Sequence, residues 1–153
     1  MEKSFKKILD GYHAFRKKYA TGDDSIMQQL AQHGQSPETL VVACCDSRVD
    51  PALVLQCDPG ELFVVRNVAN IIPPYENDPK HHGVSSALEF GVCYLNVKHL
   101  IILGHSQCGG IQALLSKEPL KQNDFMTSWL SLIQSDTASD EPDVFAKQAL
   151  LHS

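Results

Sequence analysis

Apolar residues near the N-terminus recur every three or four positions, with lysines on the other faces. This spacing predicts an amphipathic helix of about four turns. Its apolar stripe consists of Phe5, Ile8, Tyr12, Phe15 and Tyr19. A second, shorter helix is expected over residues 25–32, with Asp23 and Asp24 offering its start and Gly34 its stop.

The middle of the chain has continuous apolar runs instead. They span residues 39–44, 62–65 and 100–103 and are rich in valine, isoleucine and leucine. Such runs predict strands that are buried on both faces. Residues 84–95, between the second and third run, have helical spacing. The order strand, helix, strand predicts an α/β fold, with an open, mainly parallel β-sheet flanked by helices.

The pattern becomes helical again after the third strand. One helix is expected to open at Gly109-Gly110, and a second to start near residues 123–124 and run through Ile133. A third is expected between Asp140 and Leu150. Without repeats or linkers, we predict one domain over 1–153. Its expected parts are N-terminal helices (1–34), a central core (35–116) and C-terminal helices (117–153).

Composition removes several classes of function. The 153 residues are 43% hydrophobic and 20% charged, with 13 Lys+Arg against 18 Asp+Glu, a net charge of −5. This acidic balance argues against nucleic-acid binding, and the apolar runs are far too short to cross a membrane. No secretory signal precedes the five cysteines, so we expect a cytoplasmic protein whose thiols are buried or bind metal.

Residues able to bind metal follow two of the predicted strands. The first strand ends in Cys44-Cys45-Asp46-Ser47-Arg48, and the third in Gly104-His105-Ser106-Gln107-Cys108-Gly109-Gly110. Ligands of parallel sheets gather beyond the carboxyl ends of the strands. If these strands are neighbours, Cys44, His105 and Cys108 converge there. Two thiolates and an imidazole suit tetrahedral Zn²⁺ and leave its fourth position open.

Asp46 and Arg48 accompany these ligands and leave two interpretations open. Asp46 is either the fourth zinc ligand, or it lies beside the metal in a pair with Arg48. A guanidinium fork can hold a carboxylate in a fixed orientation next to a metal.

The two segments resemble the zinc motifs of the β-class carbonic anhydrases. The resemblance is continuous over roughly residues 31–116, and the Gln-Ser-Pro and Pro-Pro-Tyr elements are similar to the plant-type branch. Relatives usually continue with a strand hairpin, so the sequence resembles the family without that C-terminal stretch. The remaining matching segments are 34–37, 63–70, 73–75 and 89–90.

This resemblance implies a function for each motif residue. Zinc is expected on Cys44, His105 and Cys108, with Asp46 and Arg48 as the catalytic dyad. The implied substrate pocket comprises Gln35, Phe63, Val68, Phe90 and the backbone of Gly109. In the family this pocket lies at a dimer interface, so we expect a homodimer or a tetramer of dimers, with the N-terminal helix packing on a partner chain.

The implied reaction is reversible hydration of carbon dioxide to bicarbonate through a zinc-bound hydroxide. Movement of Asp46 onto the zinc would close the open position and give an inactive state. Two other functions remain open. One is hydrolysis of a similar molecule, carbon disulfide or carbonyl sulfide, at the same zinc. The other is an inactive zinc-binding assembly protein.

Overall fold

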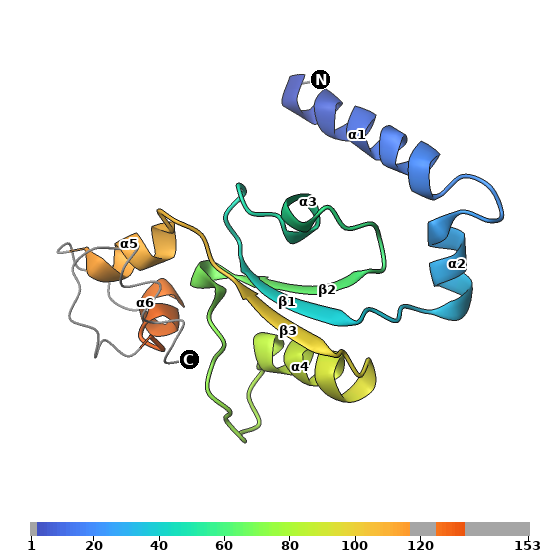
Figure 1. Ribbon diagram of the computed structural model, residues 1–153. Helices are drawn as coiled ribbons and strands as arrows, with labels where there is room; N and C mark the ends of the chain where they lie inside the picture. Colours follow the sequence, from blue (N-terminus) through green and yellow to red (C-terminus); the bar gives the residue numbers. More distant parts are fainter. Residues whose placement is uncertain (1–2, 117–124, 134–153) are drawn as a thin grey trace. The chain divides into compact units, whose positions relative to one another are not determined.

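The computed structural model of the protein describes residues 3–116 and 125–133 (Figure 1). The chain divides into two compact units, Met1–Ser36 and Pro37–Ser153. Each is described by itself, and the single domain expected over 1–153 stays a prediction. The helix predicted between Asp140 and Leu150 lies outside the described residues. In the described part of the chain, no helix combines the length and apolar character that a membrane crossing requires.

The N-terminal unit consists of the two predicted helices, α1 (Lys3–Tyr19) and α2 (Ile26–His33). The cap of α2 is Ser25, rather than Asp23 or Asp24. Ser25 directly precedes the helix in an extended conformation, and its hydroxyl accepts a hydrogen bond from the Gln28 N–H at 3.4 Å. Gly34 ends the helix as predicted, with a φ of 80° that glycine adopts readily.

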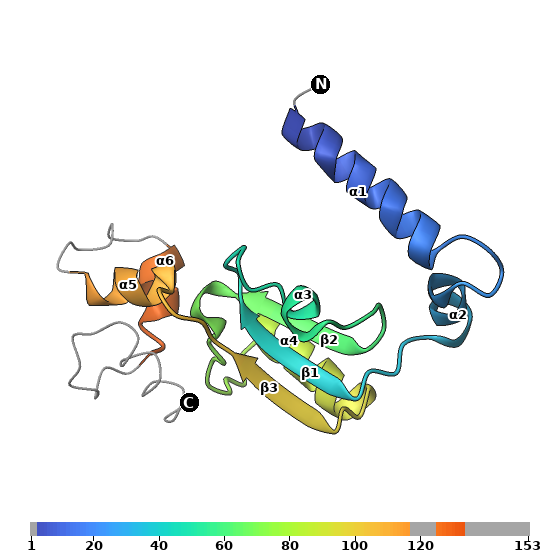
Figure 2. The same ribbon diagram turned by 45° about the horizontal axis from the view of Figure 1, so that its top comes forward.

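The second unit contains a three-stranded parallel sheet in the order β2-β1-β3 (Figures 1 and 2). The strands are β1 (Thr39–Cys44), β2 (Leu62–Asn67) and β3 (His99–Leu103). All three predicted strands are present, and the first and third are neighbours. Burial on both faces holds only for β1, because β2 and β3 are the edges of this sheet: Val64 is 38% exposed, and Leu100 and Ile101 are 47% and 39% exposed. Because β1 is the central strand, residues 40–44 are all buried, which explains their continuous apolar run.

Helices connect the strands, with α3 (Pro51–Leu55) and α4 (Gly83–Glu89) on opposite faces of the sheet in Figure 1. The pattern missed α3 because five residues are too few to show a helical period. The helix predicted over 84–95 is divided, since α4 continues into a π-helical turn, η2 (Phe90–Tyr94). Beyond β3 lie α5 (Gly109–Leu115) and α6 (Phe125–Leu130), which confirm helices at both places.

Two hydrophobic clusters hold this unit together. The α4-side cluster consists of Leu40, Val42 and Val65, with Phe63, Ile72, Val84, Ala87, Leu88 and Val97 packed against it. The loop-side cluster consists of Cys44, Ala69, Ile71, Cys108, Ile111 and Leu130. The loop-side cluster joins the end of β1 to α5 and α6, so Cys44 and Cys108 are part of the core.

Candidate metal centre

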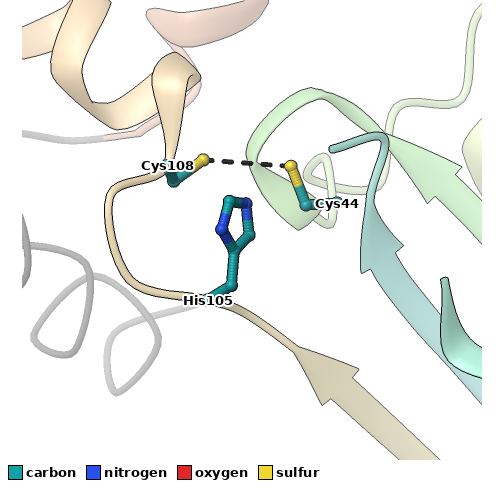
Figure 3. Close-up of side chains that lie close together, drawn as sticks. All are labelled: Cys44, His105 and Cys108. Atoms are coloured by element: carbon teal, nitrogen blue, oxygen red, sulfur yellow. Dashed lines mark hydrogen bonds between the residues drawn. The ribbon is translucent and has the colours of Figure 1, made fainter. Parts of the chain in front are cut away.

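Cys44, His105 and Cys108 converge beyond the carboxyl ends of β1 and β3 (Figure 3). One ligand atom from each residue lies within 4.8 Å of the others, and the two sulfurs are 3.9 Å apart. Cys44 is the last residue of β1, and Cys108 is the N-cap of α5. The adjacency of the strands therefore assembles the three side chains as predicted.

The imidazole of His105 has one nitrogen held by the backbone and the other without a hydrogen-bond partner among the described residues. Its Nδ1 lies 2.9 Å from the carbonyl oxygen of Ser106, to which it donates when protonated. This bond leaves Nε2 as the free lone pair. In the described part of the chain, Nε2 is buried without a hydrogen-bond partner. A buried acceptor without a partner, beside two thiols, fits a metal ligand whose second nitrogen is held by the backbone.

The thiols complete a donor set that suits zinc. Burial raises the pKa of Cys108, and the neighbouring Cys44 adds to the shift. Without a metal the Cys108 thiol thus keeps its proton at neutral pH, and metal binding releases it. Two sulfurs and one imidazole nitrogen are typical of a zinc site with one open position.

Asp46 and Arg48 form a forked ion pair next to this centre. Oδ1 of Asp46 accepts bonds from the backbone N–H and Nε of Arg48 at 2.9 and 2.8 Å, and Oδ2 accepts one from Nη2 at 2.7 Å. These bonds, from the side chain first and then the backbone, hold the pKa of Asp46 well below its usual range. The carboxylate is therefore ionised at neutral pH.

The ion pair also connects the two motif loops. Nη2 of Arg48 donates to the carbonyl oxygen of Gln107 at 3.1 Å, and Oδ2 of Asp46 lies 3.9 Å from Nε2 of His105. Of the two arrangements open from sequence, the structure has Asp46 paired with Arg48. Oδ2 accepts a single bond from Arg48 and keeps capacity for another hydrogen bond on the side of His105.

Known proteins are similar to this chain in sequence and in fold. The carbonic anhydrase family model matches residues 39–150. The chain is 42% identical to β-carbonic anhydrase 5, chloroplastic, of Arabidopsis thaliana over 127 residues, 82% of this chain and 41% of the relative. It is 35% identical to the carbonic anhydrase of Synechococcus elongatus over 131 residues, 85% of this chain and 47% of the relative.

A solved structure agrees with these matches. A tetrameric β-carbonic anhydrase of the ascomycete Sordaria macrospora superimposes with a TM-score of 0.79 at 27% identity, covering 97% of this chain and 78% of that one. The chain belongs to the β-carbonic anhydrase family. It spans less than half the length of the two curated relatives.

The pocket residues that the β-carbonic anhydrase resemblance implied lie in different surroundings. Val68 packs on the loop-side cluster, and Gly109 begins α5 immediately after Cys108. Phe63 and Phe90 pair with ring centroids 5.8 Å apart, and Phe63 packs on the α4-side cluster rather than beside the thiols. Gln35 is exposed and belongs to the N-terminal unit. The pocket as a whole stays a prediction.

The sequence analysis missed residues whose hydrogen bonds hold the loops around the candidate metal centre. The Asn67 side chain bonds both the N–H and the carbonyl oxygen of Ile71 at 2.8 Å, which closes the loop after β2. Trp129 of α6 donates from Nε1 to the carbonyl oxygen of Val68 at 2.8 Å. A third residue is Arg66, which bonds the carbonyl oxygens of Cys44 and Asp46. The sequence did contain a signal for Arg66, because it is a charged residue inside an apolar strand. The partner of Trp129 left no signal, because the two residues are far apart in the sequence.

A second group of possible ligands, Glu76, Asp78 and His82, lies in the segment before α4. The carboxylate of Asp78 already has two partners, a histidine and a lysine. Oδ1 of Asp78 bonds Nε2 of His82 at 2.7 Å, and Oδ2 pairs with Nζ of Lys80 at 2.8 Å. A lysine ammonium in contact with the cluster disfavours a cation there, so we assign no metal to it.

Proposed function

We propose that this chain carries the catalytic centre for reversible hydration of carbon dioxide to bicarbonate, with zinc as its metal. The observation that carries the proposal is the buried cluster of Cys44, His105 and Cys108 with the Asp46–Arg48 ion pair beside it. Membership of the carbonic anhydrase family supports the same reaction.

Zinc would be held by Sγ of Cys44, Sγ of Cys108 and Nε2 of His105. When bound, it would lower the pKa of a water molecule so that a nucleophile forms near neutral pH. Two thiolates neutralise the dication and weaken this effect relative to three neutral imidazoles. Groups of the protein that orient the nucleophile are therefore valuable at this site.

Asp46 is the group placed to orient the nucleophile. Its Oδ2 faces His105 and has capacity for another hydrogen bond, so it can accept a hydrogen bond from the attacking water. The lone pair of the water oxygen then points away from Asp46, toward the substrate carbon. Arg48 keeps the carboxylate ionised and ties it to Gln107 O, which opposes its movement onto the metal.

The assembled enzyme is proposed to be a homodimer or a tetramer of dimers. The stripe of α1 supports this, because Phe5, Ile8 and Tyr12 are 51%, 66% and 55% exposed and the helix has no buried residue. A relative, the Sordaria macrospora enzyme, is tetrameric. We propose that a second copy of the chain covers the stripe and completes the pocket around Val68.

Stopped-flow measurement of carbon dioxide hydration, on protein whose zinc content has been measured, tests the function. We expect about one zinc per chain and hydration that disappears when the zinc is removed and returns when it is restored. Zinc-replete protein without hydration would contradict the proposal. Turnover of carbon disulfide or carbonyl sulfide by that protein would indicate the hydrolase instead. Absence of turnover with all three substrates would indicate the zinc-binding assembly protein.

A further inference from the structure

A second arginine acts on the loop between β1 and α3. The guanidinium of Arg66, in β2, donates from Nε to the carbonyl oxygen of Cys44 at 3.0 Å and from Nη2 to that of Asp46 at 2.7 Å. Its Nη1 pairs with Oδ2 of Asp50 at 2.9 Å. We propose that Arg66 is a positioning residue of the metal centre, which fixes the main chain of a ligand and of the orienting carboxylate together.

The need for such a residue follows from where the sheet ends. Arg66 lies opposite Ala43 in the register of β1 and β2, and the last β1–β2 backbone bond runs from the Cys45 N–H to Asn67 O at 2.9 Å. Beyond it the chain leaves β2, so the ladder no longer determines the path of the main chain. The bonds from Arg66 to Cys44 O and Asp46 O replace the ladder at this point.

A guanidinium is suited to this function because its donors are fixed in one plane. Two carbonyl oxygens that lie two residues apart are held at a defined separation by Nε and Nη2. A lysine ammonium at the same position is a single point charge on a flexible stem and cannot impose this spacing. The carbonyl carbon of Cys44 is bonded to the Cα that carries the thiol side chain, so a shift there moves the sulfur.

Asp50 orients Arg66 and relates it to α3. Its Oδ2 pairs with Nη1, and its Oδ1 accepts the N–H of Leu53 at 3.4 Å as the cap of the helix. The side chains of Arg66 and Asp50 are 27% and 43% exposed, so solvent weakens their ion pair. The bonds to the two carbonyl oxygens therefore carry the positioning, and the ion pair sets the direction of the guanidinium.

The inference rests on the proposed zinc centre, so its test measures metal binding and metal coordination rather than activity. We would compare Arg66→Lys with Arg16→Lys, the same exchange on the exposed surface of α1. For each variant, the measurements are its circular dichroism, its zinc dissociation constant by chelator competition and the absorption spectrum of its Co²⁺ form. We expect folded Arg66→Lys to bind zinc about 10- to 100-fold more weakly and to have altered cobalt–thiolate absorption bands. Arg16→Lys is expected to keep the zinc affinity and the cobalt spectrum of the wild type.

A purely structural function for Arg66 predicts a different result. Folded Arg66→Lys with the zinc affinity and cobalt spectrum of Arg16→Lys would overturn the inference, even if its melting temperature were lower. If Arg66→Lys does not fold, Asp50→Ser decides, because serine still caps α3 but removes the carboxylate that orients Arg66. We expect weaker zinc binding and a changed cobalt spectrum in Asp50→Ser, and wild-type values for both would overturn the inference.

Failure of the proposed function gives a distinguishable outcome. Wild-type protein that binds zinc but does not hydrate carbon dioxide would contradict the function and leave the comparison of Arg66 with Arg16 valid. Wild-type protein with no zinc affinity would overturn both proposals.

Discussion

Each proposed ligand of the centre contacts a neighbouring backbone group. The Ser106 carbonyl selects the free nitrogen of His105, and the Asp46 N–H lies 3.5 Å from Sγ of Cys44. Backbone N–H groups at the start of α5 contact the Cys108 sulfur and oppose the rise of its pKa, although burial outweighs them. The side chains are thus oriented by the protein itself, so little rearrangement is needed when a metal binds.

Loss of a single ligand should empty the centre. We expect Cys108→Ser to lose most of its zinc, because serine is a poor zinc ligand and the α5 turn offers no other thiol. Metal analysis after dialysis measures this. Cys45→Ser is the matched control, since its exposed thiol adjoins Cys44 and is not among the clustered ligands. Full zinc occupancy of Cys108→Ser would show that the ligand assignment is wrong.

The orienting function proposed for Asp46 can be separated from metal binding. A neutral amide accepts a hydrogen bond from the attacking water more weakly than a carboxylate does, and it cannot form an ion pair with Arg48. We expect Asp46→Asn to retain zinc and to lose hydration activity by about 10²-fold or more. Stopped-flow assays of zinc-loaded protein measure this, with Asp10→Asn on the exposed surface of α1 as control. Near-normal turnover would leave Asp46 only a structural partner of Arg48.

At the scale of elements, the π-helical turn η2 packs unusually close to β1. A Cβ on Gly91 would lie 2.3 Å from Cδ1 of Leu40, which is completely buried, and 3.3 Å from Cδ1 of Phe63. The absence of a side chain at position 91 therefore sets the distance between the helix and the central strand. This explains why a glycine occurs on the buried face of the predicted helix.

Adding a methyl group at this contact should destabilise the second unit. We expect Gly91→Ala to lower the free energy of unfolding by about 1–3 kcal/mol, because the buried side chain of Leu40 must shift to admit the methyl group. Gly83→Ala is the matched control, since a Cβ there meets nothing within 4 Å at the start of α4. Thermal or urea unfolding of both variants measures the difference, and equal stabilities would contradict the close approach of η2 and β1.

At the scale of the whole molecule, the stripe of α1 is an exposed apolar surface. Proteins that function as monomers seldom expose large contiguous apolar patches. In a symmetric dimer each α1 would bury its stripe on the partner, and the same contact would bring pocket walls from both chains together.

Removal of α1 should therefore separate the subunits. We expect a chain lacking residues 2–20 to be monomeric and less active, although every proposed ligand is retained. Light scattering at micromolar concentration measures this, with Lys7→Gln, outside the stripe, as a control that keeps the wild-type assembly. A monodisperse and fully active wild-type species near the monomer mass of 16.9 kDa would contradict the dimer.

The sequence alone determined the strands and the composition of the centre. Residues 39–44 predict a central strand because every side chain of a strand covered on both faces must be apolar. His105 and Cys108 share one short loop, so their proximity follows from covalent connection. The short α3 and the π-helical turn η2 escaped prediction, because five residues do not establish a period.

Only the tertiary structure decided how these parts meet. It placed β1 between β2 and β3, which brought Cys44 to the other two ligands, and it paired Asp46 with Arg48. It also directed Arg66 to the carbonyl oxygens of Cys44 and Asp46, and Trp129 to that of Val68. A hydrogen bond between distant residues imposes no period and no spacing on the sequence, so it becomes visible only when the chain is folded.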